Sequence, residues 1–140
     1  MQMEKVKLQT DFIRVVFDDE LKLYTSIYLP TTNYMTDIEF ETQMVELKDL
    51  IEHLKPCYII DDNTNRKYGY SPEMQNWILN LFVNSWNEIG LKKYAQILPT
   101  EILGKLTAMQ IEELALQEFE MKYKHKMCED YCSALAWIKE

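Results

Sequence analysis

The sequence predicts a single α/β domain, because short β-rich runs alternate with segments whose apolar residues recur at helical spacing. Residues 56–99 show this most clearly, since an apolar strand, a polar loop, a capped amphipathic helix and a second apolar strand follow one another there. Such a βαβ unit places its two strands parallel in one sheet. A length of 140 residues and a hydrophobic content of 47% suit one domain covering residues 1–140.

The amino-terminal part predicts an antiparallel hairpin. Residues 12–17 are mostly β-branched or aromatic, and the acidic run 18–20 after them indicates a turn. Apolar and polar side chains then alternate across residues 21–29, which is the period of a half-buried strand.

Two amphipathic helices follow. Thr36 and Glu39 have the spacing of a capping box, and Pro56 ends the helix that they begin. Ser71 caps the second helix, which continues to Gly90. The buried stripe of this second helix is predicted to consist of Met74, Trp77, Ile78, Leu81, Phe82 and Ile89.

The carboxyl-terminal part adds strands at 94–98 and 122–127, and lysines alternate along the latter as in an exposed edge strand. The helical segment between them is predicted to break between Gly104 and Thr107, where a second capping box begins. A closing helix starts at Asp130. Together these elements predict a mixed, mostly parallel sheet of about five strands with about four helices.

Composition restricts the possible partners and locations. The net charge of −8 opposes binding to nucleic acid or to an anionic membrane surface. No apolar run approaches the roughly 18 residues that a transmembrane helix needs, and the amino terminus lacks the apolar stretch of a signal peptide. Three cysteines in a chain with its own core are expected to be reduced. We therefore expect a cytoplasmic protein without a nucleic-acid partner or a membrane span.

The sequence contains no recognisable catalytic or cofactor-binding pattern. Three glycines cannot supply a glycine-rich phosphate loop, and His53 and His125 have no partners at catalytic or metal-ligand spacing. Asp61 and Asp62 end a strand as acidic residues of receiver domains do, but the other residues of a receiver site have no counterpart here. A divalent metal would also need more oxygen ligands. The prediction is a non-enzymatic protein with no cofactor and no metal.

The polar loop after Asp61 is predicted to bind a partner protein. It follows a strand at the carboxyl edge of the sheet, where α/β proteins place ligands, and it precedes a helix amino terminus that favours acidic contacts. We expect the loop to be exposed. The candidate partner-binding residues are Asp62, Asn63, Thr64, Arg66, Tyr68, Tyr70 and Ser71.

Four segments carry a family resemblance, namely the strand 57–61, the Ser71-Pro-Glu helix with Trp77, the segment 90–99 and the closing helix 130–138. Their order resembles that of uncharacterised single-domain STAS-like proteins of Bacteroidetes, relatives of the sporulation anti-anti-sigma factor. The resemblance implies a β-α superhelix and a regulatory domain that binds a protein partner. A homodimer is compatible with it.

The phosphorylated serine of STAS regulators has no intact counterpart, because the matching turn is Asp61-Asp62-Asn63-Thr64 and the helix begins only at Ser71. Thr64 and Ser71 are positional candidates for phosphorylation, although helix capping alone explains Ser71. The same fold also resembles lipid-binding domains of the Sec14 type. A carrier that holds a small apolar ligand between its helices and its sheet is therefore the alternative function.

Overall fold

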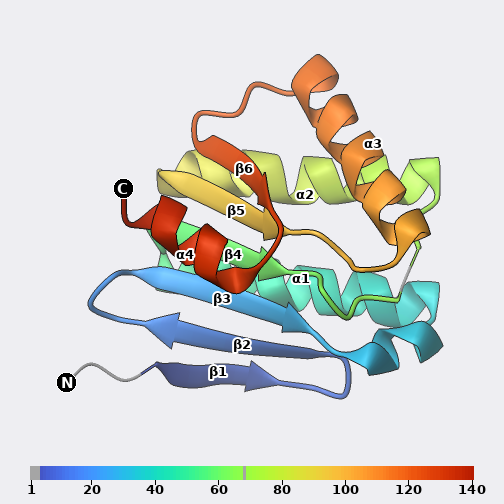
Figure 1. Cartoon of the computed structure of the whole chain (residues 1–140), viewed down its shortest axis with the longest axis horizontal. Coiled ribbons are helices and arrows are strands. Elements are labelled where there is room, and N and C mark those ends of the chain that lie inside the picture. Colours follow the sequence, from blue (N-terminus) through green and yellow to red (C-terminus); the bar gives the residue numbers. More distant parts are fainter. Residues whose placement is uncertain (1–3, 68) are drawn as a thin grey trace.

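In the computed structural model, which describes residues 4–67 and 69–140, the chain forms one sheet with helices on both faces (Figure 1). The strands in these residues are β1 (Lys5–Gln9), β2 (Ile13–Asp18), β3 (Leu23–Tyr28), β4 (Tyr58–Asp62), β5 (Lys93–Ile97) and β6 (Lys124–Cys128). The helices are η1 (Pro30–Tyr34), which is a short 3-10 helix, and α1 (Asp37–Leu54), α2 (Pro72–Ile89), α3 (Ile102–Glu118) and α4 (Tyr131–Ile138).

The strands lie in the sheet in the order in which they follow along the chain, from β1 to β6. The pairs β1–β2 and β2–β3 are antiparallel, and the pairs from β3 to β6 are parallel. The predicted α/β class, with an amino-terminal hairpin and a mostly parallel remainder, is confirmed. The sheet has six strands instead of about five, because Lys5–Gln9 adds an edge strand in which lysines alternate with apolar residues.

Three helices share one face of the sheet. The chain from β3 onward moves across the sheet by one strand at each helical crossover. In the view of Figure 1, α1 and α2 lie behind the sheet, and α3 lies beside it and crosses α2. The last helix, α4, returns over the opposite face and packs against β4, β5 and β6. Helix α2 lies between α1 and α3 and contacts both.

The predicted ends of the first two helices are confirmed. Thr36 Oγ1 accepts a hydrogen bond from the Glu39 amide at 3.1 Å, and the Glu39 carboxylate accepts one from the Thr36 amide at 3.0 Å. Ser71 Oγ accepts a hydrogen bond from the Met74 amide at 3.2 Å. Gly90 ends α2 with a φ of 76°, a left-handed conformation that glycine adopts without steric cost.

The predicted break in the third helix is wrong, because α3 runs without interruption from Ile102 to Glu118. Gly104 allows α3 to pack closely against Pro99, since a Cβ atom at this position would lie only 2.8 Å from Pro99 Cβ. Thr107 does not cap a new helix. Its hydroxyl donates to the Leu103 carbonyl one turn earlier, at 3.0 Å.

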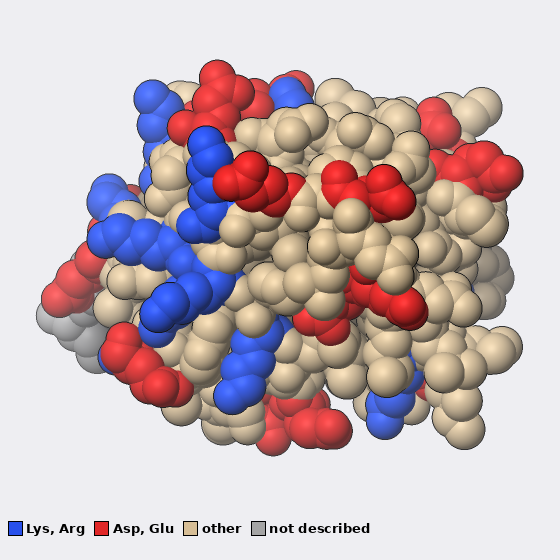
Figure 2. Space-filling model, turned by 90° about the horizontal axis from the view of Figure 1, so that it is seen from above, with Lys and Arg blue, Asp and Glu red and all other residues tan. Residues whose placement is uncertain are grey.

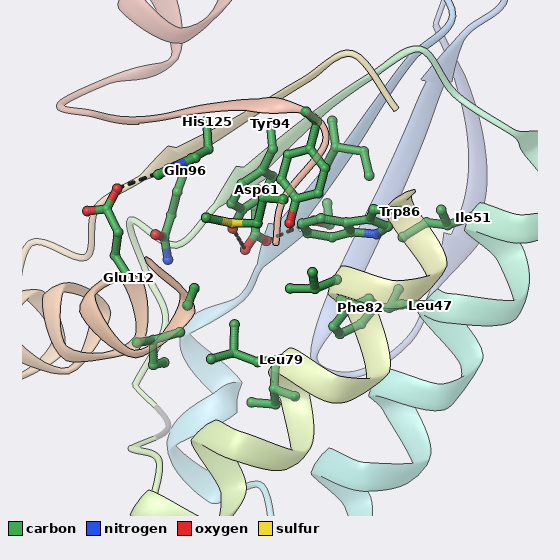
Figure 3. A pocket seen from close by; sticks show the side chains of 18 of the residues that line it. Leu47, Ile51, Asp61, Leu79, Phe82, Trp86, Tyr94, Gln96, Glu112 and His125 are labelled. Atoms are coloured by element: carbon green, nitrogen blue, oxygen red, sulfur yellow. Dashed lines mark hydrogen bonds and ion pairs between the residues drawn. The ribbon is translucent and has the colours of Figure 1, made fainter. Parts of the chain in front are cut away.

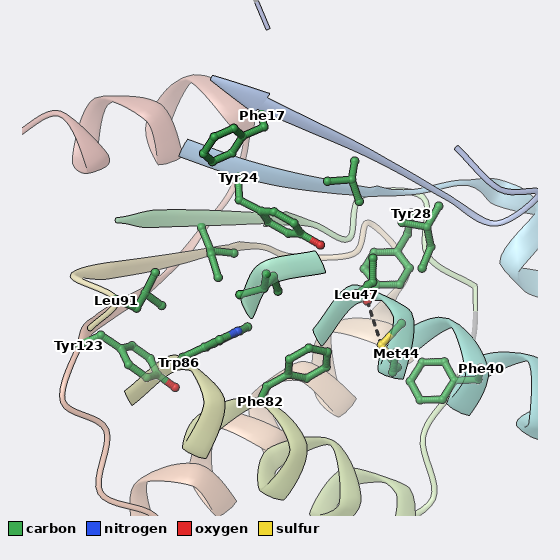
Figure 4. Packing of buried hydrophobic residues seen from close by; sticks show 14 of the residues in the cluster. Phe17, Tyr24, Tyr28, Phe40, Met44, Leu47, Phe82, Trp86, Leu91 and Tyr123 are labelled. Atoms are coloured by element: carbon green, nitrogen blue, oxygen red, sulfur yellow. Dashed lines mark hydrogen bonds between the residues drawn. The ribbon is translucent and has the colours of Figure 1, made fainter. Parts of the chain in front are cut away.

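The larger part of the core lies between the sheet and helices α1 and α2 (Figure 4). Trp86 packs against three other aromatic rings in this core. Its ring centroid lies 4.6 Å from that of Tyr94, 5.4 Å from that of Phe82 and 5.6 Å from that of Tyr123. The predicted buried stripe of α2 is correct only for Phe82, because Met74, Trp77, Ile78, Leu81 and Ile89 are only partly buried. The buried residues of this helix are Gln75, Leu79, Phe82, Val83, Ser85 and Trp86. The buried surface of α2 is wider than one stripe, because helices flank it on both sides.

Candidate functional site

A cavity of about 110 Å³ lies between the sheet and helices α1, α2 and α3 (Figure 3). Its volume approaches that of an engineered apolar cavity of about 150 Å³ that binds benzene. The strand order explains its position, because three helices that cross the same sheet face enclose a space that the side chains between them do not fill.

A row of polar side chains crosses the sheet wall of this cavity. Ser26 on β3, Asp61 on β4 and Gln96 on β5 occupy the same register on neighbouring parallel strands and all line the cavity. Side chains in register on adjacent strands lie on the same face of a sheet. The sheet therefore presents polar groups to three helices whose facing side chains are mainly apolar.

Asp61 is at the centre of this row. Its carboxylate accepts hydrogen bonds from the Ser26 hydroxyl at 2.9 Å, from the Tyr94 hydroxyl at 3.0 Å and from the Asn63 amide at 3.2 Å. Burial raises the pKa of Asp61 above its usual value, while the charge of Arg66 and the three hydrogen bonds counteract part of the rise. Both oxygens of Asp61 are thus already engaged by the protein.

Tyrosine hydroxyls surround this carboxylate. Burial raises the pKa values of Tyr24, Tyr28 and Tyr94 well above the usual range, and the nearby charge of Asp61 adds to the effect. These hydroxyls therefore stay neutral at physiological pH. The Tyr24 hydroxyl and the Trp86 indole Nε1 are both buried and have no hydrogen-bond partner among the described residues.

Arg66 brings a positive charge into the same cavity. It is only 5% exposed, and its guanidinium carbon lies 4.4 Å from the ring centroid of Tyr70 and 5.9 Å from that of Tyr28. Nη1 donates a hydrogen bond to the Tyr70 hydroxyl at 2.5 Å. Nε and Nη2 are buried and donate to no group in the described part of the chain. Burying donors without acceptors is costly, and more so for a cation.

The helix wall of the cavity is largely apolar. Figure 3 shows Leu47 and Ile51 on α1 and Leu79 and Phe82 on α2, across the cavity from Asp61. Met44, Val83 and Ala115 also belong to this wall. An entering molecule would therefore meet apolar surface on the helix side and polar groups on the sheet side.

Most of the half-exposed lining residues come from α3, β5 and β6, and they mark the mouth of the cavity on that side. A Glu112 carboxylate oxygen on α3 lies 3.1 Å from His125 Nδ1 on β6. Figure 3 shows this pair at the α3 side of the cavity. Because Glu112 and His125 connect the outermost helix to the outermost strand, they are positioned to control the width of the mouth.

The loop residues predicted to bind a partner have several different roles in the structure. Asp62 Oδ1 accepts hydrogen bonds from the Thr64 amide at 3.1 Å and from the Thr64 hydroxyl at 2.6 Å, which stabilises the turn. Ser71 caps α2. Tyr70 lines the cavity beside Arg66, and Tyr68 lies outside the described residues.

The expectation that this loop is exposed is wrong for Asn63 and Arg66, which are 0% and 5% exposed. The loop is held by its neighbours, since the Lys67 amide donates to Thr32 Oγ1 at 2.8 Å and the Thr100 hydroxyl donates to the Thr64 carbonyl at 3.3 Å. These contacts come from the segments that follow β3 and β5. The loops at the carboxyl edge therefore hold one another in place.

Several cavity residues were not singled out from the sequence as site residues. They are Glu112 on α3 and the sheet residues Tyr24, Ser26, Tyr28, Tyr94, Gln96 and His125. One signal was available, because β3, β4 and β5 each carry two polar residues beside apolar or aromatic ones. The alignment of these residues into one row becomes visible only when the strand order is known.

Comparisons with protein-family models, with curated proteins and with solved structures give no match to this chain. Within residues 4–67 and 69–140, no three histidine, cysteine, aspartate or glutamate side chains are grouped so that they would hold a metal ion. None of the helices in those residues combines the length and the apolar character needed to cross a bilayer. Fold and cavity together define the class as an α/β domain with an internal, partly polar cavity.

Proposed function

We propose that this domain binds a small, largely apolar molecule in the cavity between its sheet and helices α1, α2 and α3. The observation that carries the proposal is the pairing of an apolar helix wall with the buried Arg66, two of whose donors have no partner among the described residues. Ligand sites typically combine an apolar lining with a few polar groups that orient the ligand. The role is that of the small-ligand carrier that the Sec14-type resemblance implies.

The proposed role is binding without chemical conversion. The Ser26 hydroxyl donates directly to Asp61, with no histidine between them to act as a base. Both oxygens of Asp61 already accept hydrogen bonds from the protein. We further propose a cytoplasmic location, which agrees with the three cysteines being free.

A cavity-filling variant tests this proposal. Ala115 on α3 is buried and lines the cavity, so Ala115→Met extends a side chain into the space that a ligand would occupy. Benzene and isobutanol should shift the NMR signals of Phe82 and Val83 in the unmodified protein, and these shifts should be lost in Ala115→Met. Ala136→Met adds the same side chain at an exposed position of α4 and should bind both probes normally. Unchanged spectra of the unmodified protein with both probes would reject the proposal.

A protein-interaction role, as the STAS-like resemblance implies, is the second candidate. The outer surface of α3 favours it, because large apolar side chains are exposed there. They are Ile102, Leu103, Leu106, Met109 and Leu116, exposed by 51% to 74%. Exposed apolar patches of this kind often mark interaction sites. The 62–71 loop, which the sequence analysis predicted to bind a partner protein, remains a candidate contact surface in this second proposal.

A second copy of the chain is the partner that is tested most directly. If α3 forms a homodimer interface, sedimentation velocity should show association that increases with concentration. The double change Leu106→Gln and Met109→Gln should abolish that association, while Glu113→Gln on an exposed position of the same helix should not. Sedimentation as a monomer at every concentration would exclude the homodimer.

A further inference from the structure

We propose that the ligand of the cavity is a small apolar monocarboxylate, and that Nε and Nη2 of Arg66 bind its carboxylate group. This inference rests on the proposed function, because it specifies the chemistry of a ligand in the same cavity. Its basis is the pattern of used and unused donors on Arg66.

The two unpartnered nitrogens of Arg66 lie on one edge of the guanidinium plane. Nη1 is engaged by the Tyr70 hydroxyl at 2.5 Å, whereas Nε and Nη2 have no acceptor in the described part of the chain. The N–H bonds of Nε and Nη2 on that edge are nearly parallel, which is the arrangement that binds both oxygens of a carboxylate. The rings of Tyr70 and Tyr28, at 4.4 Å and 5.9 Å from the guanidinium carbon, hold its position.

The described residues provide no carboxylate in contact with this charge. No ion pair between Arg66 and an acidic side chain occurs among them, since their ion pairs lie elsewhere. Asp61 influences Arg66 electrostatically, but the oxygens of Asp61 accept hydrogen bonds from Ser26, Asn63 and Tyr94 instead. A buried cation without a contacting anion is unfavourable, so an anionic group from a ligand would lower the free energy of this site.

Charge and space limit the anion to a small monoanion. The cavity contains one arginine, and the neighbouring Lys67 points to the surface, where its Nζ lies 3.6 Å from Glu101. A dianion such as phosphate would bring a second negative charge close to Asp61 with no further buried cation to balance it, because the lining residue Lys126 is exposed and His125 is half-exposed and lies beside Glu112. A volume of about 110 Å³ suits a ligand of about six heavy atoms. Leu79, Phe82 and their apolar neighbours would contact its hydrocarbon part.

NMR titrations with matched acids and amides test the inference in the unmodified protein. Isovalerate and isobutyrate carry the carboxylate, and isovaleramide and isobutyramide have nearly the same shape without the charge. At neutral pH the acids should bind more tightly than the amides by a factor on the order of ten, because a charge-assisted bidentate contact replaces a neutral one. The shifted signals should belong to cavity residues such as Phe82, Val83 and Tyr94.

Variants of Arg66 and Lys67, two cationic residues that are neighbours in the sequence, supply the matched control. Arg66→Lys keeps the charge but removes the two-donor edge, so it should weaken isovalerate binding by a factor on the order of ten. Lys67→Met removes a charge one position further along the chain on the surface and should leave the affinity unchanged. The comparison of acid with amide in the unmodified protein decides the question even if Arg66→Lys does not fold.

Lysines on the protein surface require a separate control. Figure 2 shows lysine and arginine side chains gathered toward one side of the face that it displays. Lys122 and Lys124 are exposed at or beside β6, so Lys122→Gln combined with Lys124→Gln should not change the titration. Shifts that are confined to these lysines would overturn the inference.

The possible outcomes separate the inference from the proposed function. Equal affinities for acids and amides, or undiminished isovalerate binding by a folded Arg66→Lys protein, would overturn the monocarboxylate and leave the cavity as a site for neutral molecules. Binding of benzene and isobutanol without binding of the acids would also overturn the monocarboxylate and leave the cavity as a site for neutral molecules. If none of these probes binds in the cavity, the proposed function fails together with the inference.

Discussion

Glu112 on α3 and His125 on β6 lie 3.1 Å apart and join the outermost helix of the layer to the edge strand of the sheet. Helix α3 otherwise packs mainly on α2, through Ala115, Leu79 and Val83. This polar contact therefore spans the mouth of the cavity, where Figure 3 shows it.

The first prediction concerns the mobility of α3. Glu112→Ala should leave the free energy of unfolding nearly unchanged, because partly exposed pairs of this kind contribute at most about 1 kcal/mol. Amide hydrogen exchange in α3 should nevertheless become faster, since local opening depends on the few contacts that hold this helix. Glu113→Ala, on an exposed position of the same helix, should have no such effect. Equal exchange rates in the two variants would show that the pair does not hold α3.

The second prediction compares two tryptophans of α2. Trp86→Ala should lower the free energy of unfolding by about 3 to 5 kcal/mol, because it removes a large side chain packed against Phe82, Tyr94 and Tyr123. Trp77→Ala should cost clearly less, since Trp77 is only partly buried. Urea denaturation of both variants measures the difference. A larger loss for Trp77→Ala would contradict the orientation of α2 described above.

The third prediction separates capping from phosphorylation at Ser71. Ser71→Ala should cost about 1 kcal/mol, because the Met74 amide loses the hydrogen bond that it donates to Ser71 Oγ. Ser71→Asp should retain nearly full stability, since aspartate is an equally good cap and its charge suits the helix amino terminus. Thermal unfolding of the two variants at equal pH provides the measurement. Similar losses of stability in both would argue against the cap as the reason for the serine.

The fourth prediction concerns the pH dependence of stability. The pKa of Asp61 is raised in the folded state, so as pH increases the unfolded chain releases this proton first. Folding is then favoured by Asp61 below its unfolded pKa, and this contribution is lost as pH rises toward the folded pKa. Each pH unit between the two pKa values corresponds to about 1.4 kcal/mol.

Asp61→Asn removes this titration while keeping a side chain of the same shape. The free energy of unfolding of the unmodified protein, minus that of the variant, should therefore fall as pH rises above about 4. Chemical denaturation across that range measures it. Asp49→Asn, at an exposed position of α1, controls for the loss of one negative charge. A difference for Asp61→Asn that rises with pH would reverse the sign assigned to Asp61.

Local signals in the sequence were sufficient to predict most elements. The capping box of α1, the Ser71 cap of α2, the prolines and the apolar spacing act within a few residues, and the ends of α1 and α2 lie where these signals put them. The edge strand β1 was missed, although Val6 and Leu8 alternate with lysines in the pattern of a strand. The break predicted at Gly104 was wrong, because this glycine lies inside α3, where a side chain would meet Pro99.

The cavity was less predictable because tertiary contacts create it. An arginine in a polar loop is expected to face solvent. Arg66 instead turns inward, where rings from β3 and from the end of its own loop accommodate its charge. Likewise, Ser26 and Gln96 are ordinary polar strand residues until the sheet order places Asp61 between them.

The agreement between chain order and strand order has a consequence for synthesis on the ribosome. Synthesis releases the chain from its amino terminus, and contacts between nearby segments form faster than contacts between distant ones. Each parallel strand from β4 onward can add to an edge that the preceding strand has just provided. The Asp61 and Arg66 side of the cavity would then be assembled before α3 and β6 emerge, and an early ligand would meet a wide opening that the last third of the chain narrows.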